Sequence, residues 1–350
     1  MQSESIVLRD PACELLARAP RDVGGKTVPS ILQIGIGRWG VHHLRVWKKL
    51  EQLGLCCVLG VIEADESKHA QLMKDFDVFC FMPDFLQDIL PLADAVDITV
   101  PIPEHFAVAM ACLEAEKHML VEKPLVETLR QYATLTALSL RHPACQIMVG
   151  HILQYHPLTG YLKTMVENND LGQILFLRGR IQDGGPPARD GGIVATRAMH
   201  LIYAANYILG QKPTSVTAEV KHLRGQRFDD YAHITLHYPA GVFCEIEADY
   251  CTPGKCRTLQ VVGTDETATL DFHRHVLTHA ACRDSELPIL PHMQSIVGGD
   301  EEPLECELRH FLACVVSGDR PATGIQESYM TSWIVDAVYR VGTAGGRISI

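Results

Sequence analysis

The sequence reads Ile31-Leu32-Gln33-Ile34-Gly35-Ile36-Gly37-Arg38-Trp39-Gly40 near its start, an apolar run that leads into a Gly-x-Gly-x-x-Gly motif. This motif, placed between a strand and a helix, is typical of dinucleotide-binding domains. Gly35 permits the tight turn, Gly37 lets the backbone approach a pyrophosphate, and Gly40 lets helix and strand pack closely. The N–H groups at the helix N-terminus would bind the phosphates. We therefore expect a cofactor site here, with a plain tight turn as the alternative.

Apolar runs alternate with amphipathic helical stretches from residue 30 to residue 151. Such alternation predicts a Rossmann domain, a doubly wound parallel sheet with helices on both faces. We expect its strands at residues 31–35, 56–63, 78–82, 95–101, 118–122 and 145–151, and its helices at 39–53, 66–75, 105–116 and 126–139.

The pattern changes after residue 151. Helices are expected at residues 158–168, 193–209, 302–316 and 325–341, and strands at 215–222, 233–238, 242–250, 258–263 and 268–272. Short alternating strands separated by turns predict an α+β domain with a large open, mainly antiparallel sheet. We therefore divide the chain into an N-terminal extension (1–28), an NAD(P)-binding Rossmann domain (29–151), and a domain for catalysis, substrate binding and oligomerisation (152–350).

Glu63 lies at the end of the second expected strand, where an acid can bind both ribose hydroxyls of NAD. Its carboxylate would repel the 2′-phosphate of NADP, so the sequence favours NAD over NADP. Arg38 and Lys68 are cations that could turn toward a 2′-phosphate, although Arg38 precedes the helix expected to hold the pyrophosphate. An exposed loop acid is the alternative for Glu63, because Asp65 and Glu66 follow it.

The composition indicates a globular chain. Its 350 residues are 47% hydrophobic and 21% charged, with a net charge of −11 and a pI near 5.8. This acidic balance argues against nucleic-acid binding, and no apolar run of about 18 residues predicts a membrane span. Residues 1–30 lack the apolar run of a secretory signal, so we expect a cytoplasmic protein. The 12 cysteines follow no zinc spacing, so we expect buried thiols and no metal site.

Two further segments identify a family. They are Val100-Pro101-Ile102-Pro103-Glu104-His105 and His118-Met119-Leu120-Val121-Glu122-Lys123-Pro124. Together with the glycine motif they resemble the Gfo/Idh/MocA oxidoreductases, the group of glucose–fructose oxidoreductase and inositol dehydrogenase. Other matches are Val149-Gly150-His151, His156-Pro157, and Gly191-Gly192-Ile193 before a helix with His200. The resemblance implies a cofactor site made of Ile36, Arg38 and Trp39 of the glycine loop with Pro101, His105, Glu122 and Lys123.

The resemblance also implies catalytic roles. Lys123 would lie near the nicotinamide, where a lysine can hydrogen-bond a substrate oxygen or relay a proton, and its peptide bond to Pro124 is often cis in the family. The family's second-domain helix usually carries an Asp, a His four residues on, and often another Asp. This chain has Thr196, His200 and Leu201 at these positions. A neutral Thr cannot stabilise an imidazolium as an Asp does, so His200 would be a weaker base, which puts sugar-alcohol dehydrogenation in doubt.

Helical spacing places Thr196, His200 and Tyr203 on one face, which we expect to line the substrate site. Tyr203 is a candidate hydroxyl donor in place of the missing acid, and a packed tyrosine is the alternative. His151 and His156 are candidate substrate contacts, or packed histidines. Arg189 is a further candidate, or it pairs with Asp190.

The sequence favours an NAD(P)-dependent dehydrogenase acting on a sugar or nucleotide-sugar. Thr252-Pro253-Gly254-Lys255-Cys256-Arg257-Thr258 resembles family members that act on nucleotide-linked amino sugars. One alternative is a reductase of a carbonyl or imine in a specialised biosynthetic pathway. Another is a redox-inactive cofactor-binding sensor or scaffold, which the loss of both helix acids suggests and the presence of Lys123 and His200 opposes. The open sheet is a surface for self-association, so we expect a homodimer or homotetramer with no nucleic-acid or membrane partner.

Overall fold

The computed structural model describes residues 22–23, 26–185, 191–225, 227–281, 294–297, 301–344 and 346–350. They form two compact units. Unit 1 holds the described residues up to Val126, together with Gln131–Gly150 and Leu308–Ile325, and unit 2 holds Glu127–Arg130, the described part of His151–Glu307, and Gln326–Ile350. The sequence pattern assigns all residues after 151 to one domain, whereas in the structure Leu308–Ile325 belong to unit 1. One reason is visible in helix α9 (Pro303–Ser317), where the Phe311 ring packs against Trp47, with ring centroids 6.5 Å apart.

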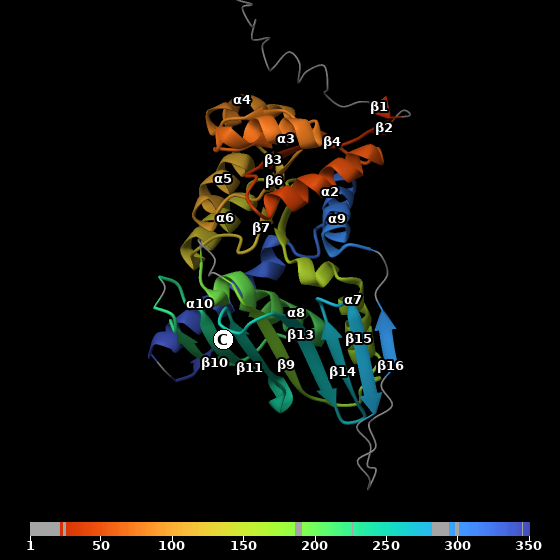
Figure 1. The fold of residues 1–350 in the computed structure, drawn as a ribbon, viewed down its shortest axis with the longest axis vertical. Helices are drawn as coiled ribbons and strands as arrows, with labels where there is room; N and C mark the ends of the chain where they lie inside the picture. The colour runs from red at the N-terminus through yellow and green to blue at the C-terminus, as the bar shows by residue number, and fades with distance from the viewer. Residues whose placement is uncertain are drawn as a thin grey trace, which may run out of the picture. The chain divides into compact units, whose positions relative to one another are not determined.

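Unit 1 is built on a six-stranded parallel sheet in the order β5-β4-β3-β6-β7-β8. Helices flank the sheet on both sides (Figure 1). The predicted doubly wound Rossmann fold is therefore confirmed. Its strands are β3 (Ser30–Ile34), β4 (Cys57–Ile62), β5 (Cys80–Phe81), β6 (Ala95–Ile98), β7 (His118–Glu122) and β8 (Ile147–Gly150), and its helices are α2 (Gly40–Gln52), α3 (His69–Phe76), α4 (Leu86–Ile89), α5 (Ile102–Glu114) and α6 (Leu129–Ser139). Short antiparallel strands β1 (Asp22–Val23) and β2 (Lys26–Thr27) precede them.

The strand order reverses beside β3, because β4 follows it on one side and β6 on the other. In open α/β sheets ligands bind outside the carboxyl ends of the strands at such a switch point. The central strands are apolar and buried, as strands covered on both faces should be. Gln33 of β3 is an exception: its amide donates to the Gly40 carbonyl (2.7 Å) and so ties the strand to the start of α2.

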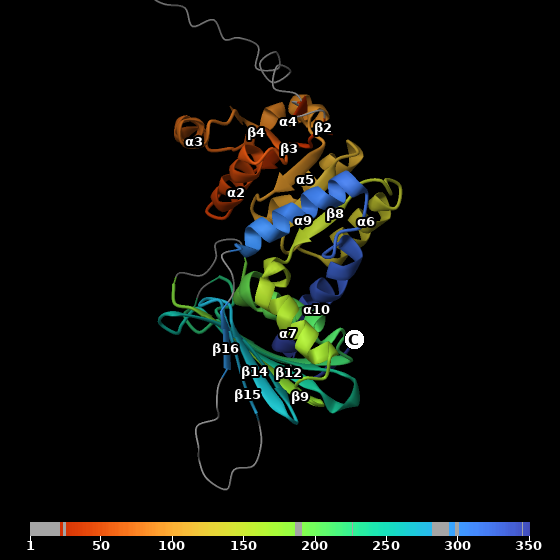
Figure 2. The same cartoon turned by 90° about the vertical axis from the view of Figure 1, so that its right-hand side faces the viewer.

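Unit 2 is built on a nine-stranded sheet in the order β16-β15-β14-β13-β9-β12-β11-β10-β17. All pairs are antiparallel except β12 with β9, so the predicted mainly antiparallel sheet is confirmed. Helices α7 (Pro157–Glu167), α8 (Met199–Leu209) and α10 (Ile325–Ala344) lie on one face of it (Figure 2). The strands are β9 (Ile174–Asp183), β10 (Ser215–Lys221), β11 (Tyr231–His237), β12 (Phe243–Asp249), β13 (Lys255–Gly263), β14 (Glu266–Asp271), β15 (Val276–Ala281), β16 (Gln294–Val297) and β17 (Ile348–Ser349).

Several features of unit 2 differ from the expected elements, since no strand was expected at β9, β15, β16 or β17. The central strand β9 was not expected, because Arg178, Gly179 and Arg180 interrupt its apolar run. Gly179 packs closely against α8, since a Cβ there would lie 3.1 Å from the Leu201 side chain. The expected helix over 193–209 begins as a π-helix (Val194–Ala198) before it becomes α8, so the spacing of side chains differs from that of a continuous α-helix.

In the part of the chain that the structure describes, no helix is long and apolar enough to cross a membrane.

Candidate active site

The first two glycines of the glycine loop have different surroundings: Gly35 is tightly packed, and Gly37 has open space beside it. Gly35 has φ of +90°, and a Cβ there would lie 2.7 Å from the backbone nitrogen of Val100, so both conformation and packing require glycine. At Gly37 the opposite holds, because among the described residues no atom beyond Gly37 and its two chain neighbours lies within 4 Å of the position that a Cβ would take. That open space is a place where a pyrophosphate can approach the backbone.

The N-terminus of α2 is suited to a phosphate. The helix starts at Gly40, its N-cap Trp39 makes no side-chain capping bond, and the first turn holds no acidic residue. Its leading N–H groups therefore have no side-chain acceptor, and together with the helix dipole they favour an anion. Ile36 is buried in the loop, whereas Arg38 and Trp39 are exposed. These residues fit the pyrophosphate of a dinucleotide.

Glu63 follows β4 and is buried, so it is not an exposed loop acid. Its Oε2 accepts a hydrogen bond from the backbone N–H of Ile36 (2.8 Å), which holds the carboxylate against the glycine loop. Its Oε1 accepts from the N–H of Asp65 (2.9 Å) and lies 3.1 Å from Nζ of Lys68. The sequence could not show that a lysine would neutralise this acid, because the ion pair depends on the turn after β4.

Lys123 follows the end of β7 and is partly buried. Its peptide bond to Pro124 is cis, as the resemblance implies. His105 of α5 is buried between two carbonyl groups: Nδ1 lies 2.8 Å from the Pro124 oxygen and Nε2 lies 2.9 Å from the Val100 oxygen. Burial lowers the pKa of His105. Both ring nitrogens face the protein backbone, so His105 holds these two segments together, while Pro101 is the exposed N-cap residue of α5.

Glu122 joins the glycine loop to the strand that carries Lys123. The indole N–H of Trp39 donates to its Oε1 (2.8 Å), and the backbone N–H of Lys123 donates to its Oε2 (3.1 Å). The same Oε1 lies 3.3 Å from Nε2 of His43. Burial alone would raise the pKa of Glu122, but His43 and Lys123 lower it.

His43 and Asp97 complete this network, and sequence reasoning missed both. Nδ1 of His43 lies 2.9 Å from Oδ2 of Asp97, which also accepts from the indole N–H of Trp47 (2.7 Å). A signal was present: Asp97 is an acid inside an apolar strand, and a buried acid needs a partner. Its partner could be found only from the sheet order.

In unit 2, the expected site residues His151, His200 and Tyr203 lie close to one another along α8 and the segment after β8. The rings of His151 and Tyr203 are stacked, with centroids 3.9 Å apart and planes at 15°. His200 lies one turn before Tyr203 and is buried. Burial raises the pKa of the Tyr203 hydroxyl, as does Glu327, so the phenol stays protonated and can donate a hydrogen bond.

The remaining expected site residues are placed differently. Thr196 is buried, donates to the Gly192 carbonyl (2.6 Å) and lies 2.7 Å from the Tyr250 hydroxyl, a contact that the sequence did not indicate. His156 is the N-cap of α7, and its Nε2 lies 2.9 Å from Nδ1 of His275. Burial and His275 lower the pKa of His156 to about 4, so it is neutral. Arg189 and Asp190 lie outside the described residues.

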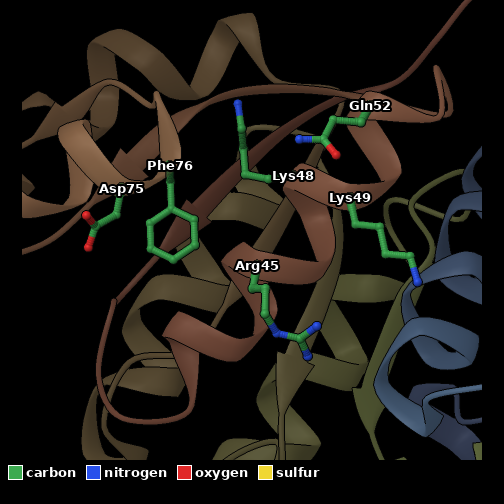
Figure 3. Close-up of a pocket in the computed structure, with 6 residues that line it drawn as sticks. All are labelled: Arg45, Lys48, Lys49, Gln52, Asp75 and Phe76. Atoms are coloured by element: carbon green, nitrogen blue, oxygen red, sulfur yellow. The ribbon is translucent and has the colours of Figure 1, made fainter.

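Two cavities have linings that include none of these residues. One, of about 330 Å³, is lined by side chains of α2 and α3 (Figure 3), namely Arg45, Lys48, Lys49, Gln52, Asp75 and Phe76. It contains no expected site residue, and Lys48 is already paired with Glu51. The other, of about 140 Å³, belongs to unit 2 and is lined by Ile181, Gln182, Asp183, Lys255, Cys256, Arg257, Phe272 and His273.

Comparison with known proteins gives matches over both units. Residues 30–151 match the family model described as "Oxidoreductase family, NAD-binding Rossmann fold", and residues 160–269 match the "GFO/IDH/MocA C-terminal domain". The scyllo-inositol 2-dehydrogenase (NAD(+)) of Bacillus subtilis is 25% identical over 304 residues, which cover 82% of this chain and 86% of that protein. The UDP-N-acetylglucosamine 3-dehydrogenase of Acidithiobacillus ferrooxidans is 23% identical over 289 residues, 81% and 88% of the two chains.

A solved structure of levoglucosan dehydrogenase in complex with NADH and levoglucosan has a TM-score of 0.82 with this chain at 18% identity. The match covers 93% of this chain and 100% of that one, and it shows a shared fold.

Proposed function

Because this chain belongs to the Gfo/Idh/MocA family of oxidoreductases, we propose that it transfers a hydride between a nicotinamide cofactor and a carbinol or carbonyl carbon of a sugar or nucleotide-sugar. The observation that carries the proposal is the hydrogen bond from Trp39 to Glu122 (2.8 Å). It fastens the glycine loop to the residue before Lys123, so the phosphate site and the candidate catalytic lysine belong to one crevice at the carboxyl ends of the strands.

The roles of this chain's residues follow from their chemistry. A bound nicotinamide would supply the hydride acceptor or donor. Lys123 would hydrogen-bond the substrate oxygen and stabilise negative charge as it develops there. In the oxidation direction, the substrate hydroxyl would give up a proton as its carbon gives up a hydride, and we assign His200 as the acceptor of that proton. Tyr203 would donate a hydrogen bond rather than accept a proton, because burial keeps it protonated.

We further propose NAD rather than NADP as the cofactor. Glu63 is held by the Ile36 N–H, and its oxygens retain lone pairs for ribose hydroxyls. A 2′-phosphate would meet this carboxylate instead, at a cost that Lys68 reduces.

A second candidate function, the reduction of a carbonyl or imine, is favoured by the same tyrosine. A phenol that stays protonated cannot accept a proton from an alcohol, but it can donate a hydrogen bond to a carbonyl oxygen. Thr196 also supplies no charge that would stabilise a protonated His200, since its hydroxyl bonds to Gly192 and Tyr250.

We also propose that the chain acts in the cytoplasm as a homodimer or homotetramer. The open face of the nine-stranded sheet, opposite the helices, is the surface that we assign to self-association. The cysteines Cys56, Cys112 and Cys244 are buried free thiols, which suits a reducing compartment.

The test is in two stages. Fluorescence titration with NADH and NADPH measures cofactor binding, and absorbance of the reduced cofactor then reports turnover with inositols, aldoses, nucleotide-sugars and their keto forms. We expect NADH binding and turnover with at least one sugar class. Binding without turnover on any of them would favour a sensor or scaffold, and no binding of either cofactor would contradict the proposal.

A further inference from the structure

The cavity of about 140 Å³ in unit 2 lies where neighbouring strands end. Its walls come from the last residues of β9, the first residues of β13 and the turn after β14. In the β9–β13 register, Asp183 is opposite Lys255, and Ile181 is opposite Arg257. Opposite residues of an antiparallel pair share a face, and so do residues two apart on one strand. Asp183, Lys255 and Arg257 therefore project from the same face, the one on which Ile181 is buried.

Positive charge exceeds negative charge around this cavity. Among the described residues of its lining, Asp183 is the one carboxylate. It is already engaged, because Arg197 donates to its Oδ2 from Nε (3.3 Å) and from Nη2 (3.1 Å). Lys255 and Arg257 bring two more cations to the lining. Together with Arg197, these lining residues make a group of three cations and one anion, in a chain whose net charge is −11.

Arg257 is the least compensated of these cations. Its guanidinium is partly buried, and it forms no hydrogen bond or ion pair with any residue that the structure describes. Burial lowers the pKa of Arg257, and the neighbouring Arg197 lowers it further, against the opposite effect of Asp183. A guanidinium removed from water without a partner is unfavourable, so the arrangement costs stability unless a ligand completes it.

We propose that this cavity binds an oxyanion group of the substrate, so that the substrate is an acidic sugar derivative rather than a neutral sugar. That the bound molecule is a substrate rests on the proposed oxidoreductase function. The binding of an anion in this cavity does not depend on that function. The guanidinium of Arg257 offers the forked donor geometry that matches phosphate and carboxylate oxygens, and Lys255 adds a point charge beside it.

The size of the cavity fits a group and not a whole sugar derivative. Sites that enclose complete ligands usually have volumes of roughly 300–1,000 Å³, so a cavity of about 140 Å³ would take only an anionic end. The excess of two positive charges matches a phosphoryl group, with a charge of about −1.5 to −2, better than a singly charged carboxylate. The experiments below distinguish a phosphoryl group from a carboxylate as the bound oxyanion.

The first measurement is anion binding without turnover. Calorimetric titrations of the full chain, with NADH saturating so that the glycine loop is covered, would use inorganic phosphate, uridine diphosphate and glucuronate as probes. We expect Arg257→Met to weaken phosphate or diphosphate binding about 10-fold or more, since a hydrogen bond to a charged group is lost. Lys255→Met should weaken it less, and Arg257→Lys should restore part of the loss. Stronger binding of glucuronate than of phosphate would identify the carboxylate as the source.

The matched control is Arg180→Met, which removes an exposed arginine of β9 that lies on the sheet face opposite to that of Arg257 and is paired with Glu247. Its affinity for the probes should stay within about 2-fold of the wild type, because exposed ion pairs contribute little. Unchanged binding in Arg257→Met, or an equal loss in Arg180→Met, would overturn the proposal. So would a wild type that binds none of the anions at millimolar concentration.

The second measurement separates this inference from the proposed function. If acidic sugars are the substrates, Arg257→Met should raise KM for them with little change in kcat, and neutral sugars should be poor substrates for both proteins. Turnover of neutral sugars that is insensitive to Arg257→Met would refute the anion site and leave the oxidoreductase standing. Anion binding through Arg257 with no turnover of any sugar would leave the site standing and refute the oxidoreductase.

Discussion

His43 donates a hydrogen bond from Nδ1 to Oδ2 of Asp97 across 2.9 Å, and both side chains are fully buried. Burial by itself lowers the pKa of His43, but the carboxylates of Asp97 and Glu122 raise it to about 10. At neutral pH the ring is therefore an imidazolium between two carboxylates. It connects helix α2 to strand β6 and to the end of β7, the elements on which the glycine loop and Lys123 depend.

Loss of this cation should destabilise unit 1. His43→Ala leaves Asp97 and Glu122 buried without their counterion, and breaking a buried pair in this way typically costs about 3–5 kcal/mol. Chemical denaturation would measure the change in the free energy of unfolding. His42→Ala, at the exposed neighbouring position on α2, is the control and should stay within about 0.5 kcal/mol of the wild type. A loss below about 1 kcal/mol in His43→Ala would show that the network contributes little.

The same network predicts a pH dependence of stability. The pKa of His43 rises from 6.5 to about 10 on folding, so its stabilising contribution is complete below pH 6.5 and is lost as pH rises through about 10. Between these values the folded state holds a proton that the unfolded state lacks. Stability should therefore fall with rising pH, by up to about 1.4 kcal/mol per unit from this group. Denaturation of wild type and His43→Gln at several pH values isolates the effect, and parallel curves would contradict the raised pKa.

Lys123→Met should impair turnover without impairing cofactor binding. The side chain lies beyond the end of β7 and supports no strand pairing, so folding and NADH affinity should be nearly unchanged. Turnover should fall roughly 10²–10³-fold, the range for removing one hydrogen-bond donor that stabilises developing negative charge. Steady-state kinetics and fluorescence titration measure the two quantities. Lys74→Met, at an exposed position on α3, is the control, and wild-type turnover in Lys123→Met would remove this lysine from the mechanism.

The Rossmann unit could be predicted because its signals are local. The glycine motif and the apolar strands each lie within a few residues, and the structure puts β7 at His118–Glu122, as the sequence indicated. The pair of His43 and Asp97 could not be predicted in this way. Its members are 54 residues apart, and they meet only because β6 lies beside β3 in the sheet.

The second unit was harder to predict, for related reasons. Strand β9 pairs with β12 and β13, more than 60 residues away, so its own sequence carries only a weak alternation around Gly179. The π-helix at Val194–Ala198 also changes the spacing that a regular helix implies. As a result Thr196 bonds to Tyr250, a partner that helical periodicity did not suggest.

Cofactor preference should depend on two residues acting in opposite directions. The Glu63 carboxylate would repel a 2′-phosphate at about 5 Å by roughly 3 kcal/mol per unit charge before screening, at an effective dielectric constant of about 20. Lys68, with Nζ 3.1 Å from Oε1 of Glu63, offsets part of this repulsion. Screening by salt reduces it further, so we expect NAD to be preferred by about 10- to 1000-fold in kcat/KM, toward the lower end.

Substitutions separate the two contributions. Glu63→Gln removes the repulsion and leaves Lys68 free to meet a 2′-phosphate, so the preference for NAD should shrink or reverse. Lys68→Met removes the offsetting cation, so the preference should grow. Glu66→Gln, an exposed acid three residues further along, should leave the ratio unchanged because it makes no contact with the glycine loop in the described structure. Steady-state kinetics with both cofactors would measure the ratio of kcat/KM for NAD to that for NADP. If Glu63→Gln and Lys68→Met shifted this ratio in the same direction, the ion pair would act only on the local fold and not on the 2′-phosphate.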